Sequence, residues 1–262
     1  MCATCGCGDD AGVRVTTVGA GQHSNDQPPH EHSHAHPHEP DPGRTVLLGQ
    51  QILAKNDHLA EHNRAWLAAR DLVAVNLMSA PGSGKTTLLE RTIRDLHAEL
   101  ALAVIEGDQE TLVDAERIEA TGCPVVQINT GAGCHLDADM TARGLRALDP
   151  RPGSVVIVEN VGNLVCPALF DLGETSRVVI MSTTEGPDKP IKYPQMFVGA
   201  HLILINKVDL LPYLDVTLEQ ITTSVRSVNP TAELIAVSAT RGQGMAQWYR
   251  WLKELGALPQ PS

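Results

Sequence analysis

The amino-acid sequence predicts an α/β fold in which helices cover both faces of a mostly parallel, doubly wound sheet of about seven strands. The first observation is that short aliphatic runs alternate with longer segments of helical periodicity from residue 73 onward. The second is that these runs are nearly continuous in Val, Ile and Leu, as expected for parallel strands that are buried on both faces. The expected strands are 73–79, 101–106, 125–129, 155–159, 178–182, 202–206 and 234–238.

Segments long enough for crossover helices separate these strands. A leading helix is expected from residue 45 to about residue 70, where apolar side chains recur at roughly helical spacing. The expected crossover helices include 86–100, 111–120, 137–148 and 218–228. Aromatic residues make up only 3% of the chain, so the core is expected to consist of Leu, Val, Ile and Ala. Residues 45–262 are therefore predicted to form one domain.

The first 44 residues differ in composition from the rest of the chain. Prolines occupy positions 28, 29, 37, 40 and 42, and the stretch 19–43 has almost no aliphatic side chains. Such a segment cannot bury enough apolar surface to offset the entropy of ordering. We therefore expect residues 1–44 to form a disordered tail. Three of the six Cys and six of the eleven His lie in this tail.

The charge balance excludes two classes of partner. The chain has 20 basic and 31 acidic residues, which give a formal net charge of −11. This balance argues against binding to nucleic acid or to an anionic membrane surface, because both require a basic face. No apolar run approaches the roughly 18 residues of a membrane span, and no basic start precedes an apolar stretch. We predict a cytoplasmic location.

A glycine-rich loop follows the first expected strand and opens the next helix. Its sequence from Ser79 to Thr86 is Ser-Ala-Pro-Gly-Ser-Gly-Lys-Thr, in which Ser79 stands where the phosphate-binding loop usually has its first glycine. Backbone N–H groups of such a loop surround phosphate oxygens, the lysine reaches the β- and γ-phosphates, and the hydroxyl binds Mg²⁺. The alternative is a glycine-rich turn that binds nothing, but the strand, Lys-Thr pair and helix together favour a nucleoside triphosphate. The expected phosphate-binding residues are Gly82, Ser83, Gly84, Lys85, Thr86 and Thr87.

Two later segments indicate that the base is guanine. Asn206, Lys207 and Asp209 form Asn-Lys-x-Asp at the end of an aliphatic run, and Ser238 and Ala239 follow the last expected strand. The Asp209 carboxylate can accept two hydrogen bonds from guanine N1–H and its exocyclic amine, which adenine cannot offer. Each segment alone could simply end a strand. Both lie at the carboxyl edge of the sheet, where α/β folds bind ligands, so GTP is favoured over ATP.

Two acidic residues are candidates for the Mg²⁺ shell and for positioning the attacking water. Glu159 begins Glu-Asn-Val-Gly at the end of a strand, where GTPases usually have Asp-x-x-Gly. Asp108 follows the second expected strand. We expect Lys85, Asp108 and Glu159 to serve in catalysis, and Thr86, Asp108 and Glu159 to hold Mg²⁺. The alternative for Glu159 is an ordinary turn between a strand and a loop.

The domain also carries candidate ligands for a transition metal. Cys134 and His135 follow a glycine-rich turn after the third strand, and Cys166 lies in the loop after Glu159. Thiolate and imidazole suit Ni²⁺ or Zn²⁺, and a second copy of the chain could complete a site with so few ligands. The alternative is that these are buried small hydrophobic side chains or surface thiols. Cys123 is expected to be a packing residue.

The tail holds a second group of possible ligands. Cys2, Cys5 and Cys7 place three thiols within six residues, near the terminal amine. Such a set could surround one ion without a folded domain, although a redox-labile tail is the alternative. Alternating histidines would bind further Ni²⁺ weakly, as a chelating tract. These histidines are His30, His32, His34, His36 and His38.

Several motifs together carry a family resemblance. They are Met1-Cys-x-x-Cys-Gly-Cys7, Pro81-Gly-Ser-Gly-Lys-Thr86, Gly107-Asp-Gln-Glu-Thr111, Gly133-Cys-His135, Glu159-Asn-Val-Gly-Asn-Leu-Val-Cys166 and Asn206-Lys-Val-Asp209. This combination, over nearly the whole chain, resembles the HypB family of GTPases that help to insert nickel into nickel–iron hydrogenase. The related urease accessory GTPases carry Cys-Pro-His and lack the Cys-rich start, so they are the weaker match.

The resemblance implies a P-loop GTPase that forms a homodimer when GTP is bound. It further implies a Ni²⁺ or Zn²⁺ site on Cys134, His135 and Cys166, and a nickel site on the three N-terminal cysteines. The implied partners are a small zinc- and nickel-binding accessory protein and the hydrogenase large-subunit precursor. Two alternatives remain: a nickel storage protein with a residual GTPase core, and a translation or signalling GTPase with incidental cysteines.

Overall fold

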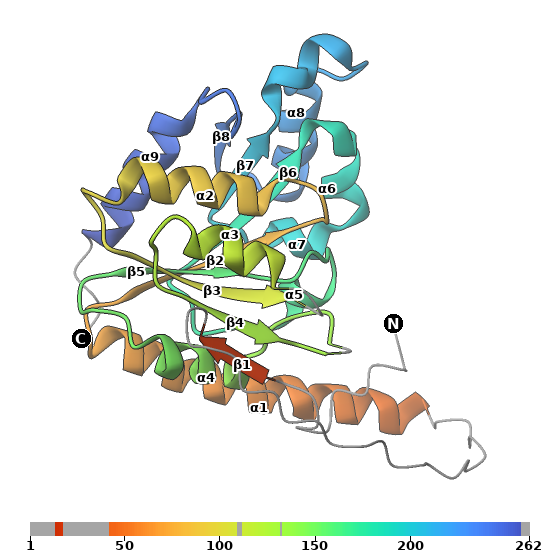
Figure 1. Ribbon diagram of the computed structural model, residues 1–262. Helices are drawn as coiled ribbons and strands as arrows, with labels where there is room; N and C mark the ends of the chain where they lie inside the picture. Colours follow the sequence, from red (N-terminus) through yellow and green to blue (C-terminus); the bar gives the residue numbers. More distant parts are fainter. Residues whose placement is uncertain (1–13, 18–41, 109–111, 132, 258–262) are drawn as a thin grey trace, which may run out of the picture.

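The computed structural model describes residues 14–17, 42–108, 112–131 and 133–257 of the chain. An eight-stranded sheet forms its centre, with strand order β1-β4-β3-β5-β2-β6-β7-β8 (Figure 1). The strands are β1 (Arg14–Thr17), β2 (Val73–Ser79), β3 (Leu102–Asp108), β4 (Val125–Asn129), β5 (Val155–Glu159), β6 (Ser176–Ser182), β7 (Leu202–Asn206) and β8 (Glu233–Ala236). All neighbouring strands are parallel except β1 and β4. The predicted doubly wound α/β class is confirmed.

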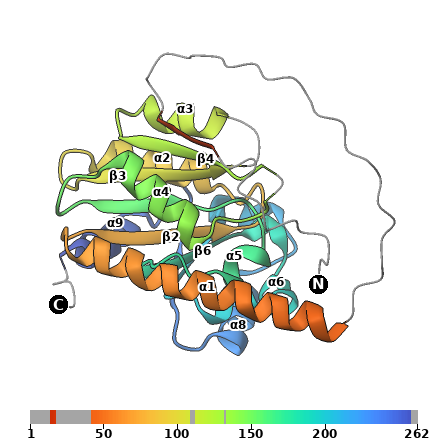
Figure 2. The ribbon, with the colours of Figure 1, turned by 90° about the horizontal axis from the view of Figure 1, so that it is seen from below.

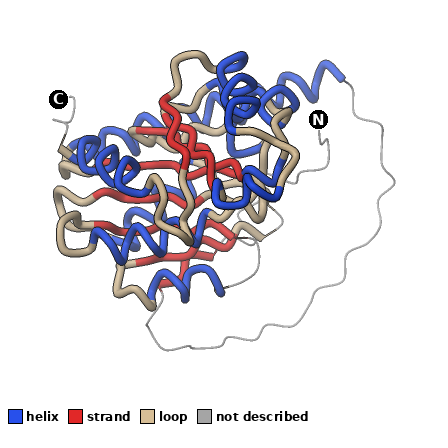
Figure 3. The backbone as a smooth tube through the Cα atoms, turned by 90° about the horizontal axis from the view of Figure 1, so that it is seen from above, coloured by secondary structure: helices blue, strands red, loops and turns tan. Residues whose placement is uncertain are grey.

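Helices lie on both sides of this sheet (Figure 3). The aliphatic side chains of α2, α3 and α9 pack on one face. Those of α1 and α4 pack on the other face near β3, β4 and β5, and those of α7 and α8 pack near β6 and β7. The helices are α1 (Pro42–Ala68), α2 (Lys85–Leu96), α3 (Val113–Glu119), α4 (Ala138–Leu148), α5 (Cys166–Leu169), α6 (Lys189–Lys192), α7 (Pro194–Val198), α8 (Leu218–Val228) and α9 (Met245–Gly256), with 3-10 turns η1 (Thr183–Glu185) and η2 (Val208–Tyr213).

The sheet has one strand more than predicted. Strand β1 lies within the segment expected to be a tail, and it pairs antiparallel with β4 at the edge of the sheet. Its Val15 is half-buried against the core beside α4. A four-residue strand carries too little hydrophobic pattern to be recognised alone, and it is stabilised here because it covers an otherwise unpaired edge. Of the other tail residues, 42–44 begin α1, and residues 1–13 and 18–41 lie outside the described part of the chain.

The helices also differ from the predicted set, which lacks the short helices α5, α6 and α7. Helix α1 begins at Pro42, three residues before the expected domain boundary, and extends to Ala68. Helix α9 lies beyond the last predicted element, and it packs Trp248 into the core, where the indole N–H donates to Thr92 Oγ1 at 2.8 Å. Within the described residues, no helix combines the length and apolar character needed to span a bilayer.

Candidate nucleotide and metal site

The predicted phosphate loop joins β2 to α2. Gly82 and Gly84 have φ of 74° and 96°, in the left-handed region that favours glycine, so the loop can turn its backbone inward. Lys85 begins α2, and its Nζ donates to Ser79 Oγ at 2.9 Å. Ser79, which replaces the usual glycine, therefore holds the lysine amine at the mouth of the loop. This arrangement suits phosphate, because the helix N-terminus and the lysine both favour an anion.

Thr86 and Glu159 meet next to this loop. Thr86 Oγ1 donates to Glu159 Oε1 at 2.7 Å, although the two residues come from α2 and the end of β5. Glu159 is buried, and its Oε2 has no hydrogen-bond partner among the residues described. Burial raises the pKa of Glu159, while the charge of Lys85 and the Thr86 hydrogen bond oppose this rise. A hydroxyl beside a buried, unsatisfied carboxylate oxygen fits the oxygen ligands that Mg²⁺ prefers.

A second buried carboxylate, Glu106, lies on the strand next to Glu159. Their Cα atoms are register partners across β3 and β5, and Glu106 Oε2 also lacks a partner within the described part of the chain. Burial, and then the charges of Glu159 and Asp108, raise the pKa of Glu106 to about 9. Glu106 belongs to none of the motifs predicted from the sequence. The available signal is a single carboxylate inside an otherwise apolar strand.

Asp108 is half-buried at the carboxyl end of β3, and its backbone carbonyl accepts from Thr130 N at 2.9 Å. It therefore lies at the same sheet edge as Glu159, since both strands are parallel and end there. Its predicted role in water or metal positioning stays a prediction.

The predicted guanine segments contact the phosphate loop directly. Asn206 Nδ2 donates to Ser83 O at 2.9 Å, and Asn206 Oδ1 accepts from Ala239 N at 3.2 Å. Lys207 has a left-handed φ of 62°, and its Nζ donates to Gly82 O at 2.6 Å. One amide thus holds the loops after β2, β7 and β8 together.

The carboxylate of Asp209 is the predicted acceptor for the guanine base. Its Oδ1 is buried and has no partner among the described residues. A buried acceptor without a partner is costly unless a ligand supplies a donor. Ser238 Oγ accepts from Arg241 N at 3.1 Å, which orders the last loop.

The three predicted body ligands for a transition metal meet in one cluster. One ligand atom from each of Cys134, His135 and Cys166 lies within 4.8 Å of the others. The Cys134 Sγ is 3.7 Å from His135 Nδ1. Phe170, which the sequence analysis did not identify, stacks on the His135 ring with centroids 4.0 Å apart. Burial lowers the pKa of His135, which favours the neutral imidazole that can bind a metal.

The remaining cysteine of the domain packs in the core. Cys123 is buried among aliphatic side chains, with its Sγ 3.4 Å from Leu102 O. Burial raises the pKa of this thiol to about 12. This placement agrees with the predicted packing role. The tail ligands Cys2, Cys5 and Cys7 and the histidine tract lie outside the described residues.

A buried asparagine joins the nucleotide side to the metal cluster. Asn160 follows Glu159 and is 1% exposed. Its Oδ1 accepts from Leu136 N at 3.1 Å, and Leu136 follows the ligand His135. Its Nδ2 donates to Asn76 Oδ1 at 3.2 Å, inside β2. The two halves of the site therefore share a hydrogen-bonded side chain.

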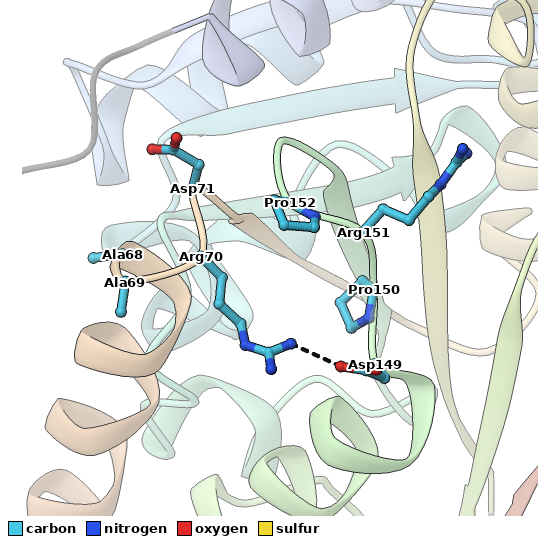
Figure 4. A pocket seen from close by; sticks show the side chains of 8 residues that line it. All are labelled: Ala68, Ala69, Arg70, Asp71, Asp149, Pro150, Arg151 and Pro152. Atoms are coloured by element: carbon cyan, nitrogen blue, oxygen red, sulfur yellow. Dashed lines mark hydrogen bonds and ion pairs between the residues drawn. The ribbon is translucent and has the colours of Figure 1, made fainter.

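A cavity of about 630 Å³ lies elsewhere, between the end of α1 and the loop that precedes β5. Figure 4 shows the ion pair at its rim, in which Arg70 Nη1 lies 2.7 Å from Asp149 Oδ1. The cavity is at the amino-terminal edge of β2 and β5, whereas the phosphate loop follows the carboxyl end of β2. It is therefore separate from the candidate site.

Comparisons with known proteins agree with this geometry. The family model for the CobW/HypB/UreG nucleotide-binding domain matches residues 73–236. The hydrogenase maturation factor HypB of Escherichia coli K12 is 55% identical over 202 residues, which cover 77% of this chain and 70% of the relative. The chain belongs to the HypB family. HypB proteins are hydrogenase maturation factors, and membership of this P-loop family implies nucleotide hydrolysis.

Two solved HypB structures have the same fold. The crystal structure from Archaeoglobus fulgidus has a TM-score of 0.73 at 41% identity, and it covers 78% of this chain and 100% of that chain. The structure of Helicobacter pylori HypB in complex with nickel has a TM-score of 0.73 at 34% identity, and it covers 79% and 98% of the two chains.

Proposed function

We propose that the chain is a GTP-hydrolysing nickel metallochaperone that helps to insert nickel into the nickel–iron hydrogenase active site. Nucleotide binding at the phosphate loop controls how tightly the neighbouring cysteine and histidine ligands hold the metal. The observation that carries this proposal is that Cys166 lies seven residues after Glu159, so the nucleotide and metal sites share one loop. The nickel complex of the Helicobacter pylori relative supports the choice of metal.

Residues of the phosphate loop and of the start of α2 bind the triphosphate. Gly82, Ser83, Gly84 and Thr87 belong to the phosphate cradle, and Lys85 moves from Ser79 to the β- and γ-phosphates. Mg²⁺, when bound, neutralises phosphate charge, and Thr86, Glu159 and Asp108 would hold it. Asp108 or Glu159 orients the attacking water.

The base side confers specificity for GTP. Asp209 accepts from the guanine N1–H and amine, and Lys207 lies along the base. The loop of Ser238 and Ala239, which Asn206 holds in place, supplies a backbone N–H to the base oxygen. The buried, unpartnered Oδ1 of Asp209 supports this assignment. Adenine has no matching donor pair, so ATP is disfavoured.

Nickel binds to Cys134, His135 and Cys166, and zinc is the alternative ion for these ligands. Three ligands leave the coordination incomplete, so a second copy of the chain, joined in a GTP-dependent homodimer, completes it. Cys2, Cys5 and Cys7 hold a further nickel ion, and the histidine tract binds more weakly. The partners are the small zinc- and nickel-binding accessory protein and the hydrogenase large-subunit precursor.

Hydrolysis of GTP releases the metal because the loop from Glu159 to Cys166 both responds to the nucleotide and carries a metal ligand. Loss of the γ-phosphate relaxes the segment from Glu159 to Cys166, and Asn160 transmits this change to the residue next to His135. A ligand can shift such an equilibrium only by its difference in affinity for the two states. The GTP and GDP forms must therefore differ in nickel affinity.

Substitution of the thiols tests the metal assignment. The full-length protein with Cys2, Cys5 and Cys7 changed to Ser isolates the thiols of the domain. In this background, Cys134→Ala and Cys166→Ala are expected to abolish the thiolate-to-nickel absorption band. Cys123→Ala is the matched control, because this thiol is buried away from the cluster, and it is expected to leave the band unchanged. A band that survives loss of both Cys134 and Cys166 would rule out the assignment.

A further inference from the structure

We propose that two buried asparagines of α1, Asn56 and Asn63, are positioning residues that set the distance between the two metal-bearing segments. The first segment, 134–138, carries Cys134 and His135, and the second, 166–172, carries Cys166. The two segments are joined to different strands and are about thirty residues apart in the sequence. Helix α1 runs alongside α4 beneath the sheet, with α5 nearby (Figure 2). This inference rests on the proposed metal site.

Asn56 bridges the two segments with one side chain. Its Oδ1 accepts from Ala138 N at 2.9 Å, and its Nδ2 donates to Asp171 O at 2.8 Å. Ala138 is the first residue of α4, so this bond satisfies one of the N–H groups that a helix start leaves without a partner. The start of α4 and the end of the Cys166 segment are thereby fixed to the same amide group.

Asn63 repeats the bridge two turns further along the same helix. Its Nδ2 donates to Ala138 O at 2.8 Å and to Leu172 O at 2.9 Å. The backbone of Gly173 then lies directly against α1, where an added Cβ would be 2.5 Å from Ala60 O and 2.7 Å from Asn63 Cβ. The second segment is therefore packed against α1 as well as hydrogen-bonded to it.

The pattern of α1 argues that these amides have a specific role. Its buried positions from residue 56 onward are Asn56, Ala60, Asn63 and Leu67, which form one stripe at helical spacing. Half of this core-facing stripe is polar, and the two asparagines are 5% and 4% exposed. Burying an amide costs free energy unless its hydrogen bonds are made, and here they are made to the two segments that carry the metal ligands.

The consequence for the metal site follows from geometry. The ligand atoms lie within 4.8 Å of one another, and the His135 ring stacks on Phe170, which directly precedes the residue bonded by Asn56. Loosening either segment from α1 would let Cys166 move relative to Cys134 and His135. Neither asparagine touches a ligand atom in the described contacts, so each acts through the backbone.

The test uses the full-length protein with Cys2, Cys5 and Cys7 changed to Ser. Asn56→Ala with Asn63→Ala is compared with Asn229→Ala. Asn229 is a matched control because it is 4% exposed and its Nδ2 donates to Phe197 O and Ala200 O, at the end of α7 and before β7, rather than to either metal-bearing segment. Thermal melting reports the general loss of stability in each variant.

Two readouts report the metal cluster itself. The first is Ni²⁺ titration, followed by the thiolate-to-nickel absorption band. The second is the rate of crosslinking by dibromobimane in the absence of metal. This reagent becomes fluorescent when it crosslinks two neighbouring thiols within one chain, here Cys134 and Cys166. Removal of groups that orient metal ligands costs about 10- to 100-fold in affinity. We expect the double variant to lose at least about tenfold in nickel affinity and to crosslink more slowly, with Asn229→Ala changing neither by more than about twofold.

A single variant keeps the test informative if the double variant unfolds. Asn56→Ala alone removes one of the two bridges and leaves that of Asn63, so we expect a smaller loss of affinity than for the double variant. Nickel affinity and crosslinking that stay at parental values in the asparagine variants would overturn the inference and leave the metal site intact. Equal losses in Asn229→Ala would also overturn it, since the effect would then be general destabilisation. A parent without a nickel band would overturn the proposed metal site together with this inference.

Discussion

The change Asp209→Asn is expected to exchange guanine specificity for xanthine specificity. In the proposed base site the carboxylate accepts hydrogen bonds from guanine N1–H and from its amine, whereas the asparagine amide would oppose that amine with a donor of its own. Hydrogen bonds to a charged group contribute about 1.5 kcal/mol or more each, so loss of the pair costs about 3 kcal/mol, or about 100-fold in GTP affinity. Because Asp209 Oδ1 is buried without a partner in the described part of the chain, no protein group replaces the lost bonds.

The same change should create a site for xanthosine triphosphate, whose C2 carbonyl accepts from the asparagine amide. Fluorescent-nucleotide displacement measures the affinities for both triphosphates in the parent and the variant. Asp215→Asn is the control, because it makes the same chemical change at an exposed position of the following loop. Unchanged GTP affinity in Asp209→Asn, or an equal loss in the control, would refute the proposed base site.

Three further predictions concern stability and reactivity. The folded protein holds a proton on Glu106 up to a pKa of about 9, whereas the unfolded chain releases it near 4.5. The unfolding free energy of the nucleotide-free parent should therefore fall, relative to that of Glu106→Gln, by about 1.4 kcal/mol per pH unit between pH 6 and pH 8. Urea unfolding in EDTA measures this difference. Gly173→Ala should cost about 2–4 kcal/mol of unfolding free energy, because the added Cβ would lie 2.5 Å from Ala60 O. Gly153→Ala is the control and should cost about 1 kcal/mol, because Gly153 also has a positive φ but faces open space. Equal shifts of the unfolding midpoint in the two variants would contradict the close packing of Gly173. Burial raises the pKa of Cys123 to about 12, so this thiol should resist iodoacetamide at pH 8 in the folded protein. Peptide mapping measures the labelling of each cysteine. Labelling of Cys123 as fast as that of the other thiols of the domain would contradict its burial.

The parts of the fold that the sequence predicts are those in which local pattern and final burial agree. Strands 155–159 and 202–206 occur at the predicted residues, because each begins with four consecutive aliphatic side chains, as expected of a strand buried on both faces of a parallel sheet. The loop between β2 and α2 is predictable for a different reason: glycine, lysine and a hydroxyl at this fixed spacing have few other uses. Strand β1 has no such pattern. It forms because it pairs with β4, more than a hundred residues away, and local sequence does not reveal this pairing.

The site residues that sequence reasoning missed are polar groups whose burial is decided by tertiary structure. Glu106 is a carboxylate in the middle of an aliphatic strand, and its pKa is raised first by burial and then by the charges of Glu159, its register partner on β5, and of Asp108. Asn56 and Asn63 resemble any polar residue of a long helix until α4 and the loop before β6 pack on them. Phe170 became relevant through its contact with His135. Local sequence does not encode which residues meet from distant segments.

The most direct measurement compares nickel affinity in the two nucleotide states. The full-length protein with Cys2, Cys5 and Cys7 changed to Ser is loaded with GDP or with a non-hydrolysable GTP analogue, and Ni²⁺ is titrated against a competing chelator. If the loop from Glu159 to Cys166 couples the two sites, the affinities differ by at least about fivefold, the lower end of typical coupling between sites. Equal nickel affinities in the two states would contradict the proposal that nucleotide hydrolysis controls metal release.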